Sequence, residues 1–175
     1  MRKVRTFVSI AAVAGLLAAL VSGTLASESP VTQDAAVDRT RDQIQMLDDL
    51  YKTAVVLMTE HYVEDTSSVS AATAAKLLFS AMKEAGHHDV RLVGLTDAIV
   101  NEENEPMDAF ERTAKTKLLA GETSHEEVVT EGGKRYLRYA TAVPVVMEKC
   151  VMCHESYRNN KGAIGSLAYK VPLIE

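Results

Sequence analysis

The residues with the most distinctive chemistry lie near the C-terminus, in the sequence Cys150-Val151-Met152-Cys153-His154. This Cys-x-x-Cys-His pattern is the attachment signature of c-type haem. Two cysteines at this spacing can form thioethers to the two vinyl groups on one edge of the macrocycle. The adjacent histidine then lies below the iron and supplies its proximal ligand. The pattern predicts one covalent haem c per chain, attached through Cys150 and Cys153, with His154 on the iron.

Other uses of the same motif fit the sequence less well. A thioredoxin-like dithiol usually follows the first strand of a βαβ unit and does not lie near the C-terminus. Structural zinc takes four ligands, but the chain has only two cysteines and no second pair of suitably spaced histidines. A disulfide between Cys150 and Cys153 would be strained and would leave His154 without a role. Zinc and a redox dithiol remain the alternatives to haem.

No local motif fixes the second axial ligand of such a haem. Met58 and His61 lie one turn apart on the apolar stripe of an expected helix, so either could face the iron. The alternative is that Met58 fills the core and His61 complements the negative end of the helix dipole. An open sixth position, which would suit gas binding, is also compatible with the sequence. Met82, Met107, Met147 and His125 are further candidates, whereas His87 and His88 are expected to be solvated.

The first 26 residues have the layout of a secretory signal peptide. Arg2, Lys3 and Arg5 precede an apolar stretch over 7–20, and a small-x-small cleavage site ends at Ala26. The apolar stretch is shorter than the roughly 20 residues that a transmembrane helix needs. We expect one domain over 27–175, periplasmic or otherwise extracytoplasmic, with no membrane span after cleavage. An uncleaved membrane anchor is the alternative.

Composition excludes several classes of protein. Of 175 residues, 47% are hydrophobic, which argues against a largely disordered chain. The formal net charge is −5, and removal of the three basic residues of the signal peptide takes it to −8. Because the chain lacks both a basic run and tryptophan, we expect no nucleic-acid partner. An acidic surface instead favours a protein partner with a basic docking patch.

Apolar periodicity and turn signals predict an α+β domain in which helices precede a small, mainly antiparallel sheet. Ser70 is a plausible N-cap for the second helix, and Glu131-Gly132-Gly133 is typical of a hairpin turn. Arg135 and Arg138 are expected to be exposed strand residues, with a contact to a haem propionate as the alternative. The expected helices cover 34–63, 70–85 and 106–120, and the expected strands cover 89–95, 125–130, 134–143 and 163–171.

The order of short motifs resembles that of the extracytoplasmic c-type haem domains with a PAS-like fold, over roughly 37–173. The resemblance implies a PAS-like antiparallel sheet with long N-terminal helices, and one haem between them attached just before the last strand. Members are free-standing secreted proteins or input domains of histidine kinases and chemoreceptors. We expect no output domain here, since the chain ends soon after the last strand. Besides the haem motif, the resemblance rests on Asn101-Glu102-Glu103-Asn104-Glu105-Pro106, Phe110-Glu111-Arg112, Tyr136-Leu137-Arg138, Pro144-Val145-Val146 and Ala163-Ile164-Gly165-Ser166-Leu167.

Three functions are compatible with these features. The first is a periplasmic monohaem cytochrome that transfers single electrons to and from redox partner proteins. The second is a haem-based redox or small-gas sensor that acts through a separate signalling protein. The third, a peroxidase, would need an open distal site with His61 or His125 as its acid–base group, and we expect no enzyme. The coordination of the iron distinguishes the three.

Overall fold

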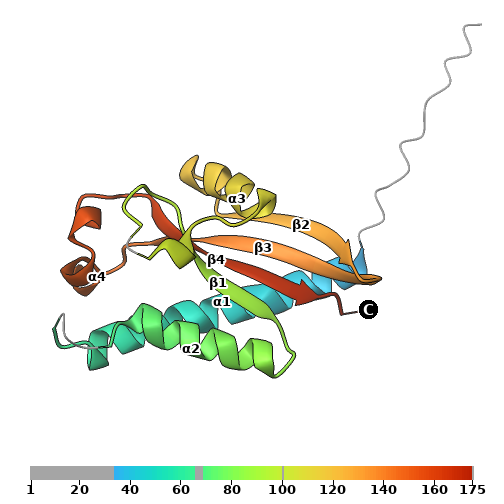
Figure 1. The fold of residues 1–175 in the computed structure, drawn as a ribbon, viewed down its shortest axis with the longest axis horizontal. Coiled ribbons are helices and arrows are strands. Elements are labelled where there is room, and N and C mark those ends of the chain that lie inside the picture. The colour runs from blue at the N-terminus through green and yellow to red at the C-terminus, as the bar shows by residue number, and fades with distance from the viewer. Residues whose placement is uncertain (1–33, 66–68, 100, 175) are drawn as a thin grey trace, which may run out of the picture. The chain divides into compact units, whose positions relative to one another are not determined.

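The computed structural model describes residues 34–65, 69–99 and 101–174, except the side chain of Cys153 (Figure 1). The expected signal peptide, 1–26, lies outside the described residues. In chain order the elements are α1 (Ala35–Tyr62), α2 (Ala71–Glu84), β1 (Asp89–Gly94), the 3₁₀ helix η1 (Glu102–Asn104), α3 (Ala109–Leu119), β2 (Ser124–Glu131), β3 (Lys134–Pro144), α4 (Glu148–Cys153), the 3₁₀ helix η2 (Glu155–Tyr157) and β4 (Ala163–Pro172).

The two long helices begin at polar caps. The Asp34 carboxylate accepts hydrogen bonds from the backbone N–H groups of Ala36 and Val37, which starts α1. Ser70 Oγ accepts a hydrogen bond from the N–H of Thr73 at 3.1 Å, as predicted, and starts α2. These side chains satisfy N–H groups that the first helical turn leaves unpaired.

The sheet has the strand order β1-β4-β3-β2, and each neighbouring pair is antiparallel. The hairpin between β2 and β3 turns at Gly132 and Gly133, both with positive φ, a conformation that glycine adopts without steric cost. The C-terminal strand β4 lies between β1 and β3 in the centre of the sheet. The strand that follows the Cys-x-x-Cys-His motif is therefore held on both sides.

Helices cover both faces of this sheet (Figure 1). On one face, α1 and α2 bury a cluster that includes Ile44, Phe79, Leu137 and Tyr169. On the other face, α3 packs over part of the sheet through a smaller cluster of Leu95, Phe110, Ala114, Leu118 and Ala140. The α+β class is confirmed, with long N-terminal helices and an antiparallel sheet.

The structure differs from the predicted elements in two places. The third helix begins at Ala109, three residues after the expected start, because Asp108 accepts a hydrogen bond from the N–H of Glu111 and caps it. The short helix α4 was not predicted, since its six residues are too few for an apolar period. No helix in the described part of the chain is both long and apolar enough to cross a membrane.

Candidate functional site

The Cys-x-x-Cys-His motif lies on α4, which sits at one end of the sheet (Figure 1). Lys149 Nζ donates hydrogen bonds to the backbone oxygens of Glu60 at 2.6 Å and Val63 at 3.2 Å. These carbonyls belong to the C-terminal end of α1, where helical C=O groups lack partners within the helix. Lys149 therefore fastens α4 to the end of α1 that carries Met58 and His61.

Helix α4 presents the motif in a form suited to attachment. Positions 150 and 153 are three residues apart within α4, a spacing that places them on one side of a helical turn. Val151, on another side, is only 2% exposed and anchors α4 to the body of the domain. The Cys150 thiol is free and half-buried. The backbone leaves the helix at His154, whose φ is −127° and ψ is 58°.

The His154 ring is held by η2. It stacks on Tyr157 with a centroid distance of 5.6 Å and an interplanar angle of 24°. Tyr157 is buried, and its hydroxyl donates a hydrogen bond to the Ala98 carbonyl at 2.8 Å, which ties η2 to the loop after β1. His154 Nδ1 is buried without a hydrogen-bond partner among the described residues.

These observations test whether the residues fit a haem. A buried ring nitrogen without a partner is uncommon, because the missing hydrogen bond is costly. A free thiol on the preceding helical turn supplies the complementary attachment chemistry. The donor set at α4 fits a covalently attached haem.

The two candidate distal residues have different environments. Met58 is half-buried in the penultimate turn of α1. His61 has a side chain that is 61% exposed, with Nε2 3.8 Å from a carboxylate oxygen of Glu60. Both lie at the end of α1 to which Lys149 binds, so the fold brings them to the same end of the domain as the motif.

The other histidines lie in the two packed cores or at the surface. His87 is exposed, as expected, but the prediction that His88 is solvated is wrong. His88 is 8% exposed, and its Nε2 lies 2.7 Å from the Tyr51 hydroxyl, because the first residues of β1 bring it under α1. Burial, with a smaller effect of the His87 charge, lowers the pKa of His88. His125 stacks on Phe110 at 5.2 Å, and burial lowers its pKa as well.

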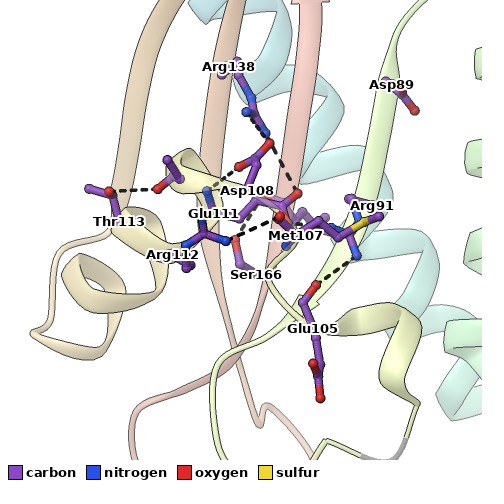
Figure 2. Close-up of polar contacts among 12 residues, drawn as sticks. Asp89, Arg91, Glu105, Met107, Asp108, Glu111, Arg112, Thr113, Arg138 and Ser166 are labelled. Atoms are coloured by element: carbon purple, nitrogen blue, oxygen red, sulfur yellow. Dashed lines mark hydrogen bonds and ion pairs between the residues drawn. The ribbon is translucent and has the colours of Figure 1, made fainter.

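Arg138 also differs from the expectation of an exposed residue. Its side chain is 16% exposed, and Nη1 lies 2.6 Å from an Asp108 carboxylate oxygen (Figure 2). Its guanidinium lies 4.2 Å from the centre of the Phe110 ring. Position 138 faces α3, which sequence alternation in a strand cannot reveal. Arg135, by contrast, pairs with Asp34 near the surface.

The sheet order, the helices on both faces and the motif before the central last strand define a PAS-like α+β domain. The chain belongs to the Tll0287-like family, whose sequence profile matches residues 27–169. The crystal structure of the cyanobacterial heme-protein Tll0287 has a similar fold, with a TM-score of 0.51 and 15% sequence identity, covering 82% of this chain and 98% of that chain. No curated protein sequence matches the chain. The family and fold class inferred from the motifs are confirmed.

Proposed function

We propose that this protein is an extracytoplasmic monohaem c-type cytochrome that transfers single electrons. Cys150 and Cys153 attach the haem, and His154 is the proximal ligand. The observation that carries this proposal is the buried, unpartnered His154 nitrogen directly after a helix that bears a free thiol. The fold shared with a solved heme-protein supports it.

The chain's own residues fix the position of the haem ligands. Tyr157 orients the His154 ring by stacking, and its hydrogen bond to Ala98 keeps η2 against the loop after β1. Val151 and Lys149 anchor α4 to the domain and to α1. When bound, the haem supplies a one-electron couple whose potential depends on axial ligation, burial and nearby charge.

The distal ligand in this proposal comes from the last two turns of α1. Met58 is the first choice, because a half-buried thioether loses little solvation on reaching the iron. His61 is the second, because its ring would have to leave solvent and Glu60. Met58→Ala should abolish the long-wavelength charge-transfer band of methionine-ligated ferric haem, whereas His61→Ala should leave it. If the wild-type ferric spectrum lacks this band and only His61→Ala changes the spectrum, His61 is the ligand. An unchanged spectrum in both variants contradicts both assignments.

The proposal includes export and partner choice. Residues 1–26 direct the chain across a membrane and are removed, and mass spectrometry of the exported protein tests cleavage after Ala26. The net charge of −8 on the remaining chain favours a redox partner with a basic surface. We propose no catalytic reaction.

A haem-based redox or gas sensor that acts through a separate protein is the second candidate function. It is favoured by the PAS-like arrangement, which the family resemblance associates with sensory input domains. A six-coordinate, low-spin iron in both oxidation states favours electron transfer. A five-coordinate iron that rapidly binds carbon monoxide favours sensing.

A pyridine haemochrome spectrum tests attachment directly. Protein produced with c-type maturation machinery should show a c-type α band at one haem per chain. The Cys150→Ser, Cys153→Ser double variant should lose all haem on acid-acetone extraction, because no thioether can form. His154→Ala is the matched control: it should keep covalent haem with a changed iron spectrum. Colour that survives extraction of the double variant contradicts thioether attachment.

A further inference from the structure

A cavity of about 840 Å³ lies along the edge strand β1, where residues of α2 and of α3 both line it, and it includes no residue of the proposed haem motif. Its floor is formed by β1, β4 and β3, and its walls by α2, the segment around η1 and the start of α3. Ala168 lies on this floor, in register between Arg91 and Ala140. Helix α3 packs over Ala140, and the neighbouring residues Arg91, Ala168 and Lys170 line the cavity.

Three basic side chains on adjacent strands border this floor. Arg138 on β3 and Lys170 on β4 are cross-strand partners. Arg91 on β1 pairs with Ala168, two residues before Lys170 on β4. The protein fixes each of them. Arg138 lies over the Phe110 ring and Lys170 Nζ lies 4.8 Å from the centre of the Tyr136 ring. The Arg91 guanidinium binds Glu111 at 2.5 Å and the Glu105 carbonyl at 3.2 Å (Figure 2).

The acidic partners of these cations differ in how firmly they are held. Glu111 is 3% exposed and also accepts a hydrogen bond from the Met107 N–H at 2.8 Å, so it is part of the wall. Glu131, which pairs with Lys170 at 2.5 Å, has a side chain that is 56% exposed. Exposed ion pairs contribute little to stability. An incoming carboxylate can therefore replace Glu131 at Lys170 with little loss.

Acidic groups on the walls are left without a cation. Seven acidic and five basic residues line the cavity. Glu102 and Glu105 line it and form no ion pair with any described residue. The net negative charge of this lining would repel a purely anionic ligand. A molecule that carries both an ammonium and a carboxylate group matches both signs of charge.

Unpartnered polar atoms provide an independent sign of a ligand. Among the described residues, three side-chain polar atoms are buried without a hydrogen-bond partner. Two of them, Asn104 Oδ1 and Arg138 Nε, belong to residues that line this cavity. Such atoms are uncommon and often mark a site completed by water or by a ligand.

We propose that this cavity binds a small zwitterion of the amino-acid class. Its carboxylate lies toward Lys170 and Arg138, and its ammonium group faces the acidic wall. The site shares no residue with the proposed haem motif. The inference therefore goes beyond the proposed electron transfer, and a test of one does not decide the other.

Ligand screening on the purified protein tests the proposal. Each of the common L-amino acids is added in turn, and a ligand that binds only the folded chain raises its Tm. The best amino acid is then compared by calorimetry with the amine that lacks its carboxylate and the acid that lacks its amine. Each analogue should bind at least about tenfold more weakly, since it loses one charged contact. The proposal is overturned if no amino acid raises Tm, or if either analogue binds as tightly as the zwitterion.

Variants of the two partners of the Lys170–Glu131 ion pair should change the affinity for the ligand in opposite directions. Lys170→Met should weaken binding at least about tenfold, because it removes a carboxylate contact. Glu131→Gln should tighten binding, because it removes the group that competes for Lys170. Lys117→Met is the control, since Lys117 pairs with Glu122 at 3.8 Å and does not line the cavity. Unchanged affinity in both Lys170→Met and Glu131→Gln overturns the placement of the carboxylate. Haem content, measured in the same samples, should match wild type.

Discussion

At the scale of single residues, the environment of a side chain decides what it can do. His154 and His88 are both largely withdrawn from solvent, but His88 has the Tyr51 hydroxyl as a partner, whereas Nδ1 of His154 has none among the described residues. The His154 ring therefore carries an unsatisfied polar atom, whereas His88 is a structural part of the core. From the sequence, His154 is predicted as a haem ligand, which stays a prediction, whereas the prediction of a solvated His88 is wrong.

The buried His88 should make the stability of the domain depend on pH. Burial and the His87 charge lower its pKa, while Asp89 partly opposes this effect. Between the ordinary pKa near 6.5 and the lower native value, the unfolded chain binds more protons than the native chain. The free energy of unfolding should therefore fall as pH falls through this window, by at most about 1.4 kcal/mol per pH unit.

Urea unfolding of His88→Gln across the same pH range checks this expectation. The variant should show a shallower pH dependence than wild type, because the titrating group is gone, while glutamine can still bond Tyr51. His125 contributes equally to both proteins, so the difference isolates His88. The exposed neighbour His87→Gln should keep most of the slope. An identical slope in wild type and His88→Gln would show that His88 keeps its ordinary pKa.

At the scale of elements, short sequence patterns predicted the helix start and the hairpin turn that depend only on neighbouring residues. Ser70 predicted the start of α2, and Gly132 and Gly133 predicted the turn of the β2–β3 hairpin. Helix α4 is too short for a periodic signal, and no side chain caps its start. Its position depends on Lys149, which binds carbonyls 86 and 89 residues earlier in the chain. Contacts at that separation leave no pattern in a sequence window.

Lys149→Met should loosen the junction of α4 and α1. Loss of the hydrogen bonds to Glu60 and Val63 leaves two carbonyls at the α1 end dependent on water, at a cost of about 1 kcal/mol in the free energy of unfolding. If Met58 ligates the iron, the methionine charge-transfer band should also weaken. Lys149→Arg keeps the donors and should restore both properties. Lys161→Met, at an exposed lysine, is the second control. If Lys149→Met and Lys161→Met have the same free energy of unfolding, the hydrogen bonds of Lys149 to α1 do not stabilise the domain.

At the scale of the whole molecule, the central position of β4 determines the strand order and the residues that line the cavity, neither of which could be predicted from the sequence. Sequence alternation identified this strand, but its insertion between β1 and β3 rests on pairings across most of the chain. The same pairing places Lys170 beside Arg138 and puts Ala168 among the residues that line the cavity. The Cys-x-x-Cys-His pattern can be recognised in the sequence because its residues lie next to one another in the chain. The cavity cannot, because it exists only once three strands and two helices have met.

Net charge is a property of the whole molecule that should control its encounters. Without the proposed signal peptide, residues 1–26, the chain carries −8, and this charge attracts cations and repels anions over distances comparable to the Debye length. For the haem-loaded protein, electron exchange with a cationic ruthenium hexaammine complex should slow as salt is added. Exchange with the anionic ferricyanide couple should accelerate. Stopped-flow rates at several ionic strengths measure both trends with one protein. If the trends have the opposite signs, a local basic patch at the haem edge, not the net charge, selects the partner.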